Sequence, residues 1–183
     1  TNISELYYPH KIFLILNEIG IPWIWNFLLH LIFSGLGMYA LLRYFSCSKC
    51  ASFFSATLYM VSPYMVAMTA FGHGSQIMTA SYIPIIILYL FKINKEIKLK
   101  DFLIFSVLIG FQLQRGHIQI AYYTWMMIGL FILINNYHII KYEAYEVSKV
   151  LKHNYYIFIS LLFGLLLSSN IYIPVLNYLN NST

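Results

Sequence analysis

Residues 24–45 read IWNFLLHLIFSGLGMYALLRYF, and this almost continuous apolar run decides the fold class of the chain. A helix of about 20 apolar residues is long enough to cross the hydrocarbon core of a bilayer. Inside that core only helices and closed barrels satisfy their own backbone polar groups. Arg43 is the single Lys, Arg, Asp or Glu of the run and lies near its end. The run therefore predicts a transmembrane helix.

Five further apolar stretches follow, at residues 51–70, 75–92, 101–114, 117–135 and 155–178. The second of the six runs should kink at Pro63, because proline removes a backbone donor and clashes with the preceding turn. We predict an all-α protein, a polytopic transmembrane bundle of about six spans. Its domains are an outer interfacial segment (1–23), a transmembrane domain (24–178) and an outer tail (179–183).

Composition supports a membrane protein. The 183 residues are 60% hydrophobic and only 9% charged, whereas soluble domains carry about 25% charged residues. The net charge of +5 does not indicate nucleic-acid binding, because the basic residues lie in short gaps between apolar runs. The chain starts at Thr1 and stops at Thr183 directly after an apolar run, so we expect a fragment of a longer protein.

The basic residues also predict orientation, since cytoplasmic loops are rich in Lys and Arg. Nine of the 11 lie in alternate connections: Arg43, Lys49, Lys92, Lys95, Lys98, Lys100, Lys141, Lys149 and Lys152. These connections are predicted to be cytoplasmic, and the others, which hold Lys11 and Arg115, to face outward. Residues 11–19 should form a short outer interfacial helix. Residues 137–154 should form a cytoplasmic surface helix.

The hairpin formed by the fourth and fifth runs is short and has a polar tip. It spans 35 residues, from 101 to 135, whereas two crossings need about 40 residues and a turn. Its tip, residues 112–119, reads QLQRGHIQ. An arginine held within the membrane needs water or a partner, so the tip is predicted to line a recess that opens outward. The alternative is an Arg115 that snorkels to the surface beside ordinary interfacial glutamines.

A second outward polar cluster, Gly72-His73-Gly74-Ser75-Gln76, precedes the third run, with Ser75 as the expected N-cap. The third and fifth helices both begin at the outer face and point free N–H groups and positive dipole ends outward. His73, Arg115 and His117 lie at these starts and predict an anion site, for example for a phosphate group. The alternative is that the two histidines only cap their helices.

Several segments together resemble the YfhO-like bacterial membrane proteins. They are LLHLIFSGLGMYALLR (28–43), Leu6-Tyr7-Tyr8-Pro9, the Gly-His-Gly turn at 72–74 followed by Tyr82-Ile83-Pro84, QRGHIQIAYY (114–123), and residues 165–176 with Asn170 and Pro174. The resemblance implies a GT-C type fold, of which this chain would be a partial core. Such proteins are glycosyltransferases that use polyprenyl-phosphate sugars on the outer face of the membrane.

The resemblance also implies a catalytic aspartate in the first outer loop, but the single aspartate here, Asp101, belongs to the predicted cytoplasmic side. No catalytic residue is therefore carried over, and no Walker loop, G-x-S-x-G or H-E-x-x-H motif is present. Residues expected to bind donor or acceptor are His73, Gln76, Arg115, His117 and Gln119. No metal ligands are predicted, although a divalent metal in the full-length protein stays open.

The sequence thus predicts a fragment of a membrane glycosyltransferase of the bacterial cytoplasmic membrane and cell envelope, with its site facing outward. Expected partners are membrane lipid and a polyprenyl-phosphate-linked sugar, and no nucleic acid. The fragment alone is expected to be inactive. The alternatives are a lipid or polysaccharide transporter or flippase module, or a non-catalytic membrane bundle.

Overall fold

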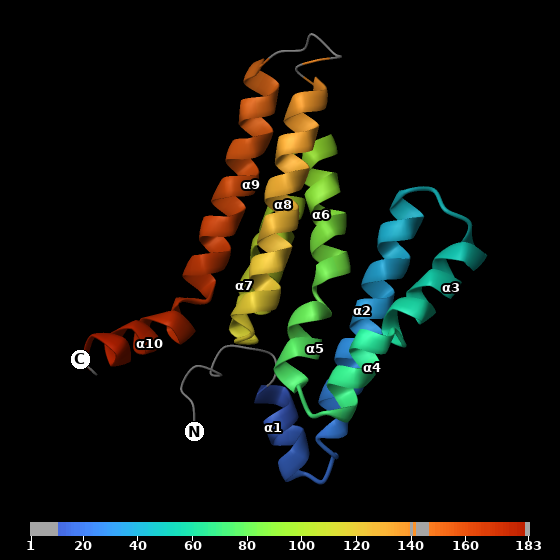
Figure 1. Ribbon diagram of the computed structural model, residues 1–183, viewed down its shortest axis with the longest axis vertical. Helices are drawn as coiled ribbons and strands as arrows, with labels where there is room; N and C mark the ends of the chain where they lie inside the picture. Colours follow the sequence, from blue (N-terminus) through green and yellow to red (C-terminus); the bar gives the residue numbers. More distant parts are fainter. Residues whose placement is uncertain (1–10, 140, 142–146, 182–183) are drawn as a thin grey trace.

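The computed structural model describes residues 11–139, 141 and 147–181, and all regular elements within them are helices (Figure 1). The helices are α1 (Lys11–Glu18), α2 (Ile24–Tyr44), α3 (Lys49–Met60), α4 (Pro63–Ala70), α5 (Gly74–Ala80), α6 (Ile83–Lys95), α7 (Leu99–Gln114), α8 (Ile118–His138), α9 (Val147–Leu167) and α10 (Ser169–Asn181). The predicted all-α class is confirmed.

Five helical segments of the described chain are long and apolar enough to cross a membrane: Ile24–Tyr44, Lys49–Ala70, Gly74–Lys95, Ile118–His138 and Val150–Leu167. Large apolar side chains cover their outer faces, with Phe53 69%, Leu133 68% and Leu166 67% exposed. Apolar surface of this extent is stable against lipid and not against water. The described helices are thus compatible with an integral membrane protein.

The fourth predicted span, residues 101–114, does not belong to these five segments. It folds as α7, which has 16 residues and lies largely inside the bundle. Phe105 and Ile109 of α7 are fully buried in a core that also holds Ile86 and Leu90 of α6, Ile128 of α8 and Ile157 of α9. Its apolar residues therefore face other helices more than lipid.

Proline divides two of the predicted spans into paired helices. α3 ends at Met60 and α4 begins at Pro63, which confirms the predicted kink. α5 and α6 are separated at Ser81 and Tyr82, and Pro84 lies in the first turn of α6. In that first turn the missing N–H of proline costs nothing, because it has no partner within the helix.

The sixth predicted span is present, but its predicted bounds, residues 155–178, are wrong. α9 begins earlier, at Val147, and ends at Leu167, after which α10 runs in a different direction (Figure 1). The break lies at Ser168, whose backbone N–H is shared between the carbonyls of Gly164 and Leu165, both at 3.1 Å. The Ser168 hydroxyl also donates to the Leu165 carbonyl at 3.0 Å and so competes with the helical ladder.

Three smaller predictions also need correction. Ser75 is not the N-cap of its helix: that position is His73, because Gly72 adopts a positive φ of 76° and the helix begins at Gly74. Residues 147–154 are the start of α9 and not part of a surface helix. The predicted tail at 179–183 overlaps α10, which continues to Asn181, and residues 182–183 lie outside the described chain.

The basic connections lie at one end of the molecule. The α2–α3 turn, the C-terminal end of α6 and the facing ends of α8 and α9 point the same way in Figure 1. At this end Lys98 forms a 2.9 Å ion pair with Glu96, and that hydrogen bond raises the pKa of Lys98. Asn94 and Asn135 exchange side-chain hydrogen bonds of 3.3 and 3.0 Å, which join α6 to α8. The basic connections thus lie on one side, and the cytoplasmic location of that side stays a prediction.

Candidate functional site

The α7–α8 turn, with its predicted site residues, reverses the chain within three residues. Arg115 is the C-cap of α7, Gly116 has a positive φ of 74°, and His117 is the N-cap of α8. The N–H groups of Arg115 and Gly116 donate to the carbonyls of Gln112 and Leu113, at 3.2 and 3.0 Å. A glycine accepts this positive φ without steric cost. Arg115 therefore sits at the negative dipole end of α7 and not, as expected, at a helix start.

The α7–α8 turn also ends short of its neighbours. Along the long axis of the molecule it stops before the α1–α2 and α4–α5 turns (Figure 1). The 16 residues of α7 extend only about 24 Å at 1.5 Å per residue, less than the hydrocarbon thickness of about 30 Å. The tip therefore ends before the α1–α2 and α4–α5 turns, whereas the outward recess around it stays a prediction.

The five predicted site residues differ in burial. Arg115 is buried, with 8% of its surface exposed, whereas His73 and Gln119 are exposed and His117 and Gln76 are half-buried. Both histidines occupy N-cap positions, yet neither ring accepts a capping hydrogen bond. The proposal that these rings serve only as helix caps therefore has no hydrogen bond to support it.

A pocket of about 300 Å³ brings three of these residues together, and we call it the polar pocket. The lining residues that the sequence predicted as site residues are Gln76 of α5 and His117 and Gln119 at the start of α8. Its other lining residues are Tyr64, Ala80, Ile83, Ile120 and Tyr123. His73 and Arg115 do not line it, so a single recess that contains His73, Arg115 and His117 stays a prediction.

The polar pocket contains groups that both donate and accept hydrogen bonds. Gln119 donates to the Tyr123 hydroxyl at 2.8 Å, an i to i+4 contact on α8. The Nδ1 atom of His117 is buried and makes no hydrogen bond within the described part of the chain. α8 starts at this point, so its positive dipole end faces the same region. Among the described residues, no carboxylate lines the pocket.

Sequence reasoning missed Tyr64 and Tyr123. Sequence spacing could have indicated Tyr123 as a site residue, since it follows Gln119 by four residues on one helix. No sequence pattern indicated Tyr64, because only the packing of α4 beside α5 brings it to the pocket. The expected positive end of a long third helix is also absent, because α5 has only seven residues before the break at Ser81. A short helix aligns fewer peptide dipoles, so α5 contributes less to an anion site.

Two other glutamines of the polar tip hold the helices together. Gln112 is fully buried, and its Nε2 atom donates to the Thr79 carbonyl at 3.2 Å and to the Thr124 hydroxyl at 2.9 Å. These bonds join α7 to α5 and α8, two of the helices that line the polar pocket. Gln114 donates to the Leu167 carbonyl at 2.7 Å and ties the end of α7 to the end of α9. Polar groups often join transmembrane helices in this way.

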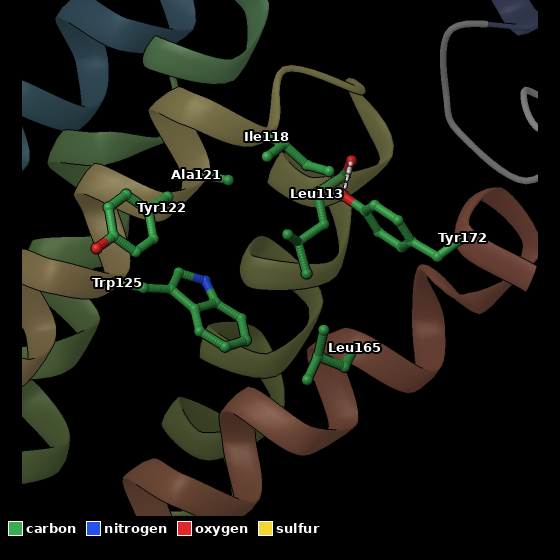
Figure 2. A pocket seen from close by; sticks show the side chains of 7 residues that line it. All are labelled: Leu113, Ile118, Ala121, Tyr122, Trp125, Leu165 and Tyr172. Atoms are coloured by element: carbon green, nitrogen blue, oxygen red, sulfur yellow. Dashed lines mark hydrogen bonds between the residues drawn. The ribbon is translucent and has the colours of Figure 1, made fainter. Parts of the chain in front are cut away.

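A second pocket, of about 260 Å³, lies on the other side of α8, and we call it the apolar pocket. It is lined by Leu113, Ile118, Ala121, Tyr122, Trp125, Leu165 and Tyr172 (Figure 2). Tyr172 of α10 donates its hydroxyl to the Leu113 carbonyl at 3.3 Å. The two pockets thus use different faces of the first turns of α8.

Among the described residues, no three His, Cys, Asp or Glu side chains gather where they could hold a metal ion. Comparisons of the chain with protein-family models, with curated proteins and with solved structures found no match. The resemblance to YfhO-like proteins therefore rests only on the sequence segments quoted above.

Proposed function

We propose that this chain binds the sugar-phosphate head group of a polyprenyl-phosphate-linked sugar in the polar pocket, as part of a membrane glycosyltransferase. The site would face outward from the bacterial cytoplasmic membrane. The observation that carries the proposal is the meeting of Gln76, His117 and Gln119 in one pocket beside helices long enough to cross a membrane.

The lining suits a sugar with many hydroxyl groups. Carboxamides both donate and accept hydrogen bonds, as hydroxyl groups require. The rings of Tyr64 and Tyr123 add apolar faces with a polar edge. His117 and the first N–H groups of α8 are the lining groups best suited to a phosphate.

The described lining of the polar pocket does not supply every group that sugar transfer needs. Inverting transfer needs a base that removes the proton of the acceptor hydroxyl, and no carboxylate of the described residues lines the polar pocket. The pocket would thus hold the donor and stabilise the leaving phosphate. The carboxylate that the family resemblance implies would come from another part of the full-length protein.

Binding measurements on the chain in lipid nanodiscs test the proposal. A fluorescent polyprenyl-phosphate hexose should bind saturably, and Gln76→Ala and Gln119→Ala should each weaken binding about fivefold, the effect of one net hydrogen bond. Ser75→Ala is the control, because Ser75 is exposed near Gln76 and does not line the pocket. Equal affinity of all three variants and the native chain would rule out this pocket.

A further inference from the structure

The end of the bundle opposite the polar pocket carries a cluster of lysines (Figure 1). α6 ends at Lys95, Lys98 is the N-cap of α7, Lys100 lies in the first turn of α7, and Lys152 lies near the start of α9. All four residues are exposed, and we call them the lysine patch. None of them lines the polar pocket.

The packing of α7 against α9 brings lysines of both helices to one level. Three contacts occur in the same order along the two helices: Phe102 with Tyr156, Gly110 with Gly164, and Gln114 with Leu167. The helices therefore run side by side in the same direction. The rings of Phe102 and Tyr156 lie 5.9 Å apart, and Lys98 and Lys152 each precede this pair by four residues, about one helical turn. The two lysines thus stand at the same height on adjacent helices.

The lysine patch keeps a positive charge although two acids lie beside it. Glu96 forms the 2.9 Å ion pair with Lys98, and Asp101 is half-buried in the first turn of α7. Four lysines and these two carboxylates leave an excess of two positive charges. α7 also begins here, and its N-cap makes no side-chain capping hydrogen bond, so its first N–H groups add a positive dipole end.

Exposed apolar side chains begin directly beside these lysines. Leu99 is 72% and Leu103 is 51% exposed on α7, and Tyr155 is 61% exposed on α9. Lysines at such a boundary keep their ammonium groups in the polar layer while their stems lie on apolar surface. The charges of the patch are therefore at the level where the phosphate groups of a bilayer meet its hydrocarbon. A free anion would use only the charges, whereas a phospholipid would use both kinds of surface.

We propose that the lysine patch binds the head-group phosphate of an anionic phospholipid, whose acyl chains pack on the exposed apolar side chains below it. Long lysine side chains on helices packed as closely as α7 and α9 can contact one phosphate from two sides, each as a point charge. A net negative head group offsets the excess positive charge, which a zwitterionic lipid does not. The bound lipid links α7 to α9 at a site separate from the polar pocket.

The test uses the whole chain in a neutral maltoside detergent and phosphatidylglycerol that carries a fluorophore on one acyl chain. Fluorescence anisotropy should show saturable binding that unlabelled phosphatidylglycerol reverses. Phosphatidylcholine with the same acyl chains should not displace the label, and neither should inorganic phosphate at the same ionic strength. Added sodium chloride should weaken the binding, because salt screens exposed charges.

Charge-neutral variants locate the site. Lys98→Gln and Lys152→Gln should each weaken binding about fivefold, the effect of one lysine near a membrane surface. Lys152→Arg keeps the charge and should bind as the native chain does. Lys49→Gln is the matched control, because Lys49 is also exposed at this end of the molecule but belongs to α3. Circular dichroism should show the same helix content in all four variants, since each replaces an exposed side chain.

Four results would overturn the inference. Two concern the ligand: phosphatidylcholine displaces the label as well as phosphatidylglycerol does, or inorganic phosphate displaces it. The other two concern the place: Lys98→Gln and Lys152→Gln both bind like the native chain, or Lys49→Gln weakens binding as much as they do. The last result would mean that the whole basic end attracts anionic lipid without a site between α7 and α9.

Discussion

Gly110 of α7 and Gly164 of α9 pack backbone to backbone. A Cβ built on Gly164 would lie 3.2 Å from the Gly110 nitrogen and 2.8 Å from the Ile109 Cβ, and one on Gly110 would lie 2.9 Å from the Leu167 Cβ. Small residues let transmembrane helices approach this closely and gain dispersion energy. The contact positions α9 so that Leu165 and, through α10, Tyr172 reach the apolar pocket.

We expect Gly164→Ala to destabilise the bundle, because the added methyl group overlaps Ile109 and the α7 backbone. Overpacking of this kind costs about 1–3 kcal/mol. Gly129→Ala on α8 is the matched control, since nothing lies within 4 Å of a Cβ there and alanine favours the helix. Denaturation in mixed micelles measures both variants. A Gly164→Ala protein as stable as Gly129→Ala would contradict the close contact.

The Gln112–Thr124 hydrogen bond should be measurable as a coupling energy. Both side chains are fully buried, and the bond of 2.9 Å joins α7 to α8. Hydrogen bonds between transmembrane helices contribute about 0.6 kcal/mol on average and up to about 1.7 kcal/mol. A double-mutant cycle with Gln112→Leu and Thr124→Val should give a value in this range. Strictly additive losses of stability would show that the two side chains do not interact.

Topology can be tested with single cysteines in a background that lacks Cys47 and Cys50. Lys95 and Ser75 are both exposed, at the end of α6 and in the first turn of α5. The bias of basic residues predicts that Lys95→Cys is cytoplasmic and Ser75→Cys is outside. A membrane-impermeant maleimide added to intact cells should label only Ser75→Cys. Labelling of both positions from outside would contradict the predicted topology.

The two N-cap histidines should differ in their effect on donor binding. His117 lines the polar pocket and His73 does not, although both are N-caps without a side-chain capping bond. His117→Ala should therefore weaken binding of the polyprenyl-phosphate hexose about fivefold or more, and His73→Ala should leave it unchanged. Equal losses in both variants would favour the recess shared by His73, Arg115 and His117 over the polar pocket.

The chain by itself should transfer no sugar, because the described lining of the polar pocket holds no carboxylate base. The acids on the predicted outer side are Glu5, which lies outside the described residues, and Glu18, which is exposed on α1 and does not line the pocket. Incubation of the purified chain with a polyprenyl-phosphate hexose and acceptor sugars should give no product by mass spectrometry. Turnover would mean that another group of this chain acts as the base.

Local chemistry made part of the fold predictable. The break at Pro63 could be foreseen, because proline lacks a backbone donor in any surroundings. The break at Ser168 could not, since serine within apolar helices usually bonds back to the preceding turn and lets the helix continue. Whether its hydroxyl ends the helix depends on the room that neighbouring helices leave, and here α10 turns to place Tyr172 against Leu113.

The sequence by itself determined that the chain is helical, that its apolar runs are long enough to cross a membrane, and which connections carry the basic residues. Those properties follow from composition and length, because a bilayer leaves few solutions for apolar chains. Only the tertiary structure decided the roles of Gln112 and Gln119, which lie in one polar segment. Gln112 is fully buried between helices, whereas Gln119 lines a pocket. The partner of a glutamine is set by the helix packed opposite it, which local sequence does not specify.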